Sequence, residues 1–268
     1  MAQNWIGISG WTFPPWRGTF YPKGVTQKKE LEYASRKLSS IEINGTFYAL
    51  QKPSTFQKWY SETPEGFVFA VKAPQFITHI LRVKEVAEPV ANFFASGLLC
   101  LKEKLGPILW QFPPNVKLKD DRFEKFLKLL PQDSKSAVET ARAHSERMEG
   151  RSFTTAKGIT RVRHAFEFRH PSFLNPDFLD LLRAHNVAFV FAHEGGKNAP
   201  YTEEATADFI YARLHGEGKK YAKGYSDREI EKWATKIQKW NKDAYVYFSN
   251  EAKVYTPKGA MKLMKALG

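Results

Sequence analysis

The chain has 268 residues, 43% of them hydrophobic and 15% aromatic, which is enough to bury a substantial core. Its formal net charge of +13, from 41 Lys and Arg against 28 Asp and Glu, suggests a polyanionic partner, although a solvated, lysine-rich surface explains the charge equally well. A single cysteine excludes an intrachain disulfide and a cysteine-rich metal site. No apolar run is long enough to span a bilayer and no signal peptide is visible, so we expect a cytoplasmic protein.

Short runs rich in β-branched and aromatic residues alternate with helical patterns along the whole chain. They predict eight strands: Trp5–Ser9, Ser40–Asn44, Phe67–Lys72, Ile108–Phe112, His164–Arg169, Val187–Ala192, Phe209–His215 and Ala244–Ser249. No low-complexity linker divides them. Eight strand–helix units in a row predict an α/β fold, a single (β/α)8 TIM-type barrel that spans residues 1–268.

Helical patterns with boundary signals lie between these strands. A long apolar segment with a helical period is predicted over Val90–Leu105, with Gly106 as its C-cap. Asn175, just before a proline, predicts the start of a helix over Asp177–Ala184. Ser226 opens a further helix, because a glutamate three residues on completes a capping box.

The connection between the fourth and fifth predicted strands is unusually polar and basic. It covers about residues 132–163, and part of it, Ala137–Met148, has the pattern of a solvated helix. Two interpretations remain open. The segment is either a basic arm that contacts an anionic partner or an exposed insertion that contacts nothing.

Strand alternation predicts which side chains point into the barrel. Residues two apart on a strand share a face. In the seventh predicted strand the apolar residues at even positions suit packing against outer helices, which turns Arg213 and His215 inward. The same alternation turns Glu42, Lys72 and Glu167 inward on three other strands.

Most of the predicted strands end in polar residues. In a parallel barrel these positions converge on the C-terminal rim, where this fold keeps its active sites. Gln111 fits the alternation, whereas Asn250 fits only if its strand ends or bulges first. The predicted catalytic residues are Glu42, Glu167 and His215, and the predicted substrate-binding residues are Asn44, Lys72, Gln111, Arg169, His170, Arg213, Trp11 and Asn250.

These residue types are suited to anion binding and proton transfer. Guanidinium groups bind carboxylate or phosphate bidentately, and a glutamate or a histidine can move a proton. The structural alternative is an internal ion-pair network that only fills the barrel, since buried charges must pair. No metal or other cofactor is expected, because the histidines lack the close spacing of a metal motif and nearby cations repel a divalent ion.

The motifs at these strand ends resemble those of the YecE-like family, known as domain of unknown function 72. They follow the family order along nearly the whole chain: Gly7-Ile8-Ser9-Gly10-Trp11, Phe20-Tyr21-Pro22, Glu42-Ile43-Asn44, Gln111-Phe112-Pro113-Pro114, Glu167-Phe168-Arg169-His170 and Arg213-Leu214-His215-Gly216. The chain departs from the family at its last strand, where Ser249-Asn250-Glu251 replaces Asn-Asn-Asp. The resemblance implies a TIM-barrel fold and brings no established reaction.

Three functions remain open from the sequence. The first is an enzyme, a hydrolase or isomerase by fold analogy, that binds a small anionic, phosphate-bearing substrate at the C-terminal rim and uses acid–base catalysis. The second is a nucleic-acid-binding or nuclease-like barrel, suggested by the net charge and the basic connection. The third is a non-catalytic barrel with a structural polar interior. No membrane partner is expected.

Overall fold

A ring of parallel strands forms the centre of the computed structural model, which describes residues 2–193, 200–216, 224–250 and 254–268. The strands in these ranges are β1 Asn4–Ser9, β2 Ser40–Ile43, β3 Val68–Lys72, β4 Leu105–Gln111, β5 His164–Glu167, β6 Val187–Phe189, β7 Phe191–His193, β8 Phe209–Leu214 and β9 Asp243–Phe248. They form one sheet in the order β6-β5-β4-β3-β2-β1-β9-β8-β7. The alternating units predicted from the sequence therefore share one sheet.

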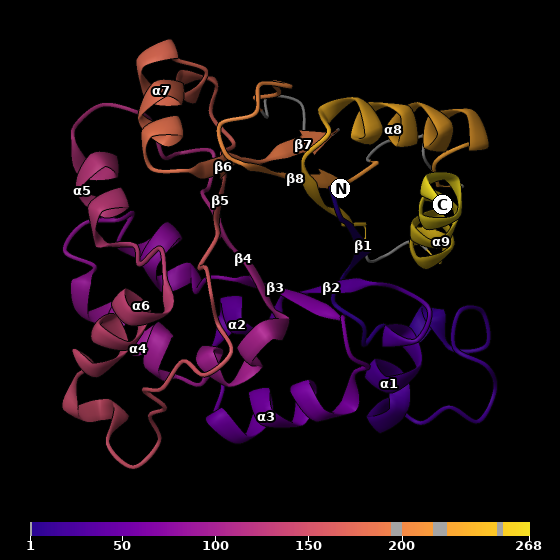
Figure 1. Ribbon diagram of the computed structural model, residues 1–268, viewed down its shortest axis with the longest axis horizontal. Coiled ribbons are helices and arrows are strands. Elements are labelled where there is room, and N and C mark those ends of the chain that lie inside the picture. Colours follow the sequence, from indigo (N-terminus) through magenta and orange to yellow (C-terminus); the bar gives the residue numbers. More distant parts are fainter. Residues whose placement is uncertain (1, 194–199, 217–223, 251–253) are drawn as a thin grey trace.

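The sheet becomes a nearly closed barrel because its two edges belong to one chain segment. β6 pairs with β5, where Val187 lies opposite His164, and β7 pairs with β8, where Phe191 lies opposite Ala212. The predicted strand Val187–Ala192 is thus split in two. Together with the interleaved helices in Figure 1, this arrangement confirms the predicted TIM-type α/β barrel.

Most helices surround the ring of strands (Figure 1). The α-helices are α1 Glu30–Ser35, α2 Gly45–Tyr48, α3 Pro53–Glu62, α4 Ala87–Ala95, α5 Arg122–Leu129, α6 Ser134–Arg142, α7 Pro176–Ala184, α8 Asp227–Trp240 and α9 Thr256–Leu267. Shorter helical segments are η1 Pro14–Trp16, η2 Gln27–Lys29, the π-helical η3 Phe76–Ile80, η4 Leu98–Lys104, η5 Glu146–Met148 and η6 Pro171–Phe173. Within the described ranges, no helix combines the length and the apolarity that a membrane crossing requires.

The predicted alternation of strand faces is confirmed by two separate hydrophobic layers. The outer layer, between strands and helices, contains Ile41, Phe69, Phe166, Ile210 and Leu214, and the inner layer contains Ala70, Leu109, Ala165, Tyr211 and Tyr247. The strands approach closely at Gly7, where a Cβ atom would lie 1.9 Å from the Ser40 carbonyl oxygen. A side chain at this position would therefore force β1 and β2 apart.

Two helix N-caps were predicted correctly, whereas one long helix was not. The Asn175 side chain accepts a hydrogen bond from the Phe178 N–H at 3.0 Å, and Ser226 forms its predicted capping box. The predicted helix Val90–Leu105 is wrong: α4 ends at Ala95, and Gly97 adopts a φ of +117°, in the left-handed region. η4 follows that break, and the predicted cap, Gly106, lies inside β4 instead.

The polar connection before β5 is folded onto the barrel. Helix α6 packs against α4, and its Ala137 and Ala141 are fully buried. The Ser145 N–H donates to the Asn92 Oδ1 atom at 2.9 Å. The interpretation of this segment as an insertion that contacts nothing is therefore wrong. The predicted helix Ala137–Met148 is instead α6, which spans Ser134–Arg142.

Candidate functional site

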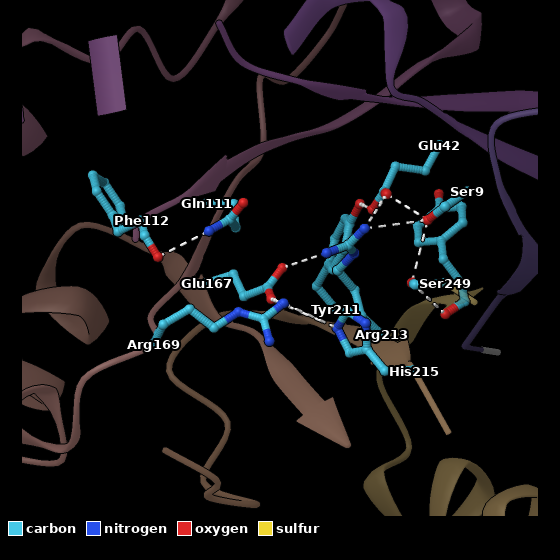
Figure 2. Close-up of polar contacts among 11 residues, drawn as sticks. Ser9, Glu42, Gln111, Phe112, Glu167, Arg169, Tyr211, Arg213, His215 and Ser249 are labelled. Atoms are coloured by element: carbon cyan, nitrogen blue, oxygen red, sulfur yellow. Dashed lines mark hydrogen bonds and ion pairs between the residues drawn. The ribbon is translucent and has the colours of Figure 1, made fainter. Parts of the chain in front are cut away.

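A buried network of charges joins β2, β5 and β8 in the barrel interior. The Arg213 Nη2 atom donates to Glu42 Oε1 at 2.8 Å, and its Nη1 atom donates to Glu167 Oε2 at 2.7 Å. Both carboxylates are fully buried, and the Arg213 side chain is 5% exposed. Figure 2 shows the guanidinium between the two carboxylates. Because β1 and β9 separate β2 from β8 in the sheet, the Arg213–Glu42 contact crosses the interior, as the predicted inward orientation requires.

Glu42 is held by hydroxyl donors as well as by Arg213. The Ser9 hydroxyl donates to its Oε1 atom at 2.5 Å, and the Tyr211 hydroxyl donates to its Oε2 atom at 2.6 Å. The hydroxyl oxygen of Ser249, the residue after β9, lies 3.2 Å from that of Ser9. Burial, together with the neighbouring Glu42, raises the pKa of Tyr211, so its proton stays available for the hydrogen bond. In this inner half of the network, which comprises Glu42, Ser9 and Tyr211, both carboxylate oxygens thus have hydrogen-bond donors.

Glu167 forms the outer half of the network with two residues that follow β5 and β8. The Nη2 atom of Arg169 forms an ion pair with Glu167 Oε1 and lies 3.4 Å from His215 Nε2. The same imidazole nitrogen is 3.6 Å from Glu167 Oε1. Arg169 is 19% exposed, and no described residue accepts a hydrogen bond from its Nε or Nη1 atom. This guanidinium therefore retains donors for a ligand.

The network shifts the pKa values of two groups that can transfer protons. Burial alone would raise the pKa of Glu167, but Arg213 and Arg169 outweigh burial and hold this pKa well below its usual value. Burial lowers the pKa of His215, and although Glu167 opposes the shift, Arg213 and Arg169 add to it. At neutral pH the site therefore pairs an ionised carboxylate with a neutral imidazole.

Two predicted ligands make short local contacts. His170 Nδ1 accepts a hydrogen bond from the Ser172 N–H at 3.1 Å, which caps η6. The Gln111 side chain donates to the Phe112 carbonyl oxygen at 2.9 Å (Figure 2). Both residues lie at the expected strand ends, but neither makes a described hydrogen bond to the charge network.

Trp11 and Asn250 lie at the ends of β1 and β9. Trp11 packs edge-on against Trp59, with ring centroids 5.5 Å apart. The Asn250 side chain donates to the Gly216 carbonyl oxygen at 3.4 Å, and β9 ends at Phe248, before Asn250. Glu251, at which the chain departs from the family pattern, lies outside the described residues.

Asn44 and Lys72 lie at the ends of the neighbouring strands β2 and β3. Asn44 precedes α2, and the Lys72 Nζ atom is 4.0 Å from the centroid of the Phe47 ring. The Thr46 hydroxyl donates to the Lys72 carbonyl oxygen at 2.7 Å and ties α2 to β3. Burial and the nearby Lys72 lower the pKa of His79, which packs edge-on against Phe47.

Sequence reasoning missed the hydroxyl groups that hold Glu42. Tyr211 was detectable, since it shares the inward face with Arg213, but Ser9 and Ser249 carry no signal beyond their position near strand ends. In the part of the chain that the structure describes, no three His, Cys, Asp or Glu side chains gather as metal ligands do.

Comparison with known proteins identifies the family. Residues 5–268 match the sequence model of a family described as "Protein of unknown function DUF72". The UPF0759 protein YunF of Bacillus subtilis (strain 168) is 25% identical over 281 aligned residues, which cover 92% of this chain and 89% of YunF. The UPF0759 protein YecE of Escherichia coli (strain K12) is 28% identical over 136 residues, which cover 50% of this chain and 47% of YecE.

Solved structures show the same fold. A DUF72 family protein from Thermotoga maritima MSB8 superposes with a TM-score of 0.76 at 24% identity, covering 99% of each chain. Another, from Enterococcus faecalis V583, has a TM-score of 0.71 at 16% identity and covers 99% of this chain and 95% of its own. At such identities these structures establish the fold alone. The resemblance noted in the sequence is confirmed, and the chain belongs to the DUF72 family.

Proposed function

We propose that the chain is an enzyme that binds an anionic, phosphate-bearing substrate at the C-terminal end of the barrel and transfers a proton through His215. The observation that carries this proposal is the outer half of the charge network, where Arg169, His215 and Glu167 meet. It combines a cation that has unused donors with a neutral imidazole beside an ionised carboxylate. These are the parts that acid–base catalysis on an anion requires.

Arg169 is the anion ligand in this proposal. Arg213 has both of its Nη atoms on carboxylates, and its Nε atom is buried without a hydrogen bond, so it is poorly placed to bind a ligand. Arg169 is partly exposed and can offer its Nε and Nη1 donors to a phosphate. We assign Lys72, at the end of β3, as a second cation for the same substrate.

His215 is the proton-transfer group in this proposal, and Glu167 positions it. Because the neutral ring carries a proton on one nitrogen only, its other nitrogen can accept one. Glu167 then stabilises the imidazolium that forms. A bound anion raises the pKa of His215, since nearby negative charge favours the protonated ring.

The inner half of the network fits the structural alternative better. Glu42 accepts hydrogen bonds on both oxygens and has no exposed atom, which suits a residue that anchors Arg213. We therefore place proton transfer on the outer half. The nucleic-acid hypothesis remains a separate prediction, which the binding of an oligonucleotide tests.

Anion binding can be tested without knowing the substrate. Inorganic phosphate is titrated into protein that carries ¹³C at the histidine Cε1 atoms, with the His215 resonance assigned by His215→Asn. We expect saturable shifts and a higher pKa of His215 in the presence of phosphate. Arg169→Gln should abolish both effects. The control Arg161→Gln, which removes a surface ion pair with Asp208, should bind phosphate like the wild type. Equal binding by Arg169→Gln would rule out this anion site.

Proton transfer is tested by screening phosphate esters and sugar phosphates for turnover. For any substrate found, His215→Asn should abolish turnover while the affinity for inorganic phosphate changes little. Glu167→Gln should lower the pKa of His215 further, because it removes the charge that raises this pKa. Turnover that survives in His215→Asn would contradict the proposed role.

A further inference from the structure

A groove of about 530 Å³ opens on the barrel surface where the segments that follow β2 and β3 meet α4 and η5. Four large apolar side chains line it and are unusually exposed: Tyr48 at 73%, Leu50 at 41%, Phe76 at 51% and Ile80 at 65%. Among the described residues, they make up half of the eight large hydrophobic side chains with such exposure. Apolar side chains gathered in this way mark an interaction surface.

Two arginines border this apolar groove. Arg147 and Arg151 line it, and the Arg151 Nε atom donates to the Arg147 carbonyl oxygen at 2.8 Å. Neither makes an ion pair with a described residue, so both charges are available to a partner. The groove contains one carboxylate among its lining residues, Glu88. Its net charge is therefore positive.

The surface beside the groove extends the positive charge. A second hollow shares Ile80 with the groove and is lined by Arg82, Lys84, Lys117, Lys119 and Arg122. Of these cations, Arg122 forms an ion pair with Asp120. A partner that reaches beyond the groove thus meets further cations.

The backbone that follows Ile80 is strained. Arg82, Val83 and Glu85 have φ values of +51°, +57° and +49°, in the left-handed region that non-glycine residues seldom adopt. Such a conformation is unfavourable for a residue with a side chain, and Val83 is buried and anchors the segment. The preceding η3 is a π-helix, another conformation that is frequent at functional sites. The fold therefore holds the segment next to Ile80 of the groove in an unfavourable conformation.

We propose that this groove binds an amphipathic segment of a partner protein. Apolar side chains of that segment would enter between Tyr48, Phe76 and Ile80, and its Asp or Glu residues would pair with Arg147 and Arg151. The proposal does not depend on the proposed enzyme activity, because it rests on different residues.

Shape and charge favour this occupant over three others. A hollow can receive side chains inserted by a partner protein. A bilayer surface is instead contacted by side chains that protrude from the protein. Tyr48 and Phe76 offer stacking faces for bases, but Leu50 and Ile80 do not, and the Glu88 carboxylate repels phosphates. A symmetric contact with a second copy would bring the same cations of two chains together.

Selection from a display library tests the proposal on the full chain. A random 16-residue peptide library is selected on the wild-type protein, and enriched peptides are measured by fluorescence anisotropy. We expect enriched peptides to combine apolar residues with Asp or Glu. Their affinity should fall about tenfold or more, or roughly 1.4 kcal/mol, in Ile80→Asp and in the double variant Arg147→Gln/Arg151→Gln. The matched controls are Leu174→Asp, at an exposed leucine outside the groove, and Arg142→Gln, and both should bind like the wild type.

Several outcomes would overturn the proposal. These are the absence of enriched peptides, peptides that lack acidic residues, and affinities that the groove variants leave unchanged. Two further probes are a fifteen-residue oligothymidylate and vesicles with anionic lipid. Groove-dependent binding of the oligonucleotide, in preference to the peptides, would assign the surface to nucleic acid, and groove-dependent binding of vesicles would assign it to a membrane. All variants change exposed side chains, so we expect them to fold like the wild type. Unchanged circular dichroism and an unchanged melting temperature verify this.

Discussion

Replacing Arg213 by Met should destabilise the protein strongly, because the change leaves two buried carboxylates without their shared cation. Removing one partner of a buried ion pair costs roughly 3–5 kcal/mol. Glu42 keeps its hydroxyl donors and Glu167 keeps Arg169, so we expect a loss of unfolding free energy within this range rather than twice as large. At about 2–4 °C per kcal/mol for a chain of this size, the melting temperature should fall by roughly 6–20 °C.

Arg183 provides a matched control on the surface. It also bridges two carboxylates, those of Asp180 and Glu204, but its side chain is 40% exposed. Surface ion pairs contribute about 0–1 kcal/mol, so Arg183→Met should change the unfolding free energy by no more than that. Both variants are compared with the wild type by urea unfolding at pH 7, followed by circular dichroism.

The pH dependence of the Arg213→Met effect tests the electrostatic reasoning. The folded pKa of Glu167 is depressed, so its contribution to stability is present above its unfolded pKa, about 4.3, and is lost as the pH falls through the folded pKa. Without Arg213 the pKa of Glu167 is depressed less, so the difference in unfolding free energy between wild type and variant should narrow below about pH 4. Adding Glu42→Gln and Glu167→Gln to Arg213→Met should recover much of the loss. A loss under about 1 kcal/mol at pH 7, or a gap that acid leaves unchanged, would refute the reasoning.

Two further predictions concern a buried histidine and metal content. Burial lowers the pKa of His164 to about 4, while its Nδ1 accepts from Trp110 and its Nε2 contacts the Pro131 carbonyl oxygen. The neutral imidazole should contribute fully to stability above its unfolded pKa, about 6.5, and this contribution should be lost as the pH falls towards 4. In His164→Gln the unfolding free energy, measured with urea, should therefore depend less on pH between these values. An equal pH dependence in wild type and variant would contradict the assignment. Protein purified without chelators should hold far less than one metal per chain by elemental analysis; stoichiometric zinc, iron or manganese would instead make Glu42, Glu167 and His215 candidate ligands.

The inward residues could be predicted from the sequence because strand alternation is a local property. The apolar faces of the strands identify the outer layer, and the polar residues of the other face must then lie inside. The partners of each charge could not be predicted in the same way. Arg213 reaches Glu42 across the ring, and this pairing depends on the width and stagger of the closed barrel. The sequence therefore predicted Arg213 as an anion ligand, whereas the structure shows a cation shared by two carboxylates.

The break between α4 and η4 shows why helix boundaries were harder to predict. The apolar period continues from Val90 to Leu105, so the sequence shows one pattern. A tertiary contact nevertheless requires a glycine inside this pattern, since a Cβ atom at Gly97 would lie 2.6 Å from the Pro53 Cα atom. Glycine permits both this approach and the left-handed turn that ends the helix. The periodicity of one segment carries no information about its neighbour across the fold.

The groove was beyond sequence reasoning for a related reason. Ile77 and Ile80 are three residues apart in η3, yet the first is 1% exposed and the second 65%. Only the assembled fold separates their environments and brings Arg147 beside them. Phe47 belongs both to the groove and to the rim of the proposed active site, because its ring contacts Lys72. Substitutions at Phe47 would perturb both sites at once, so Ile80, Arg147 and Arg151 are the positions at which the two proposals can be told apart.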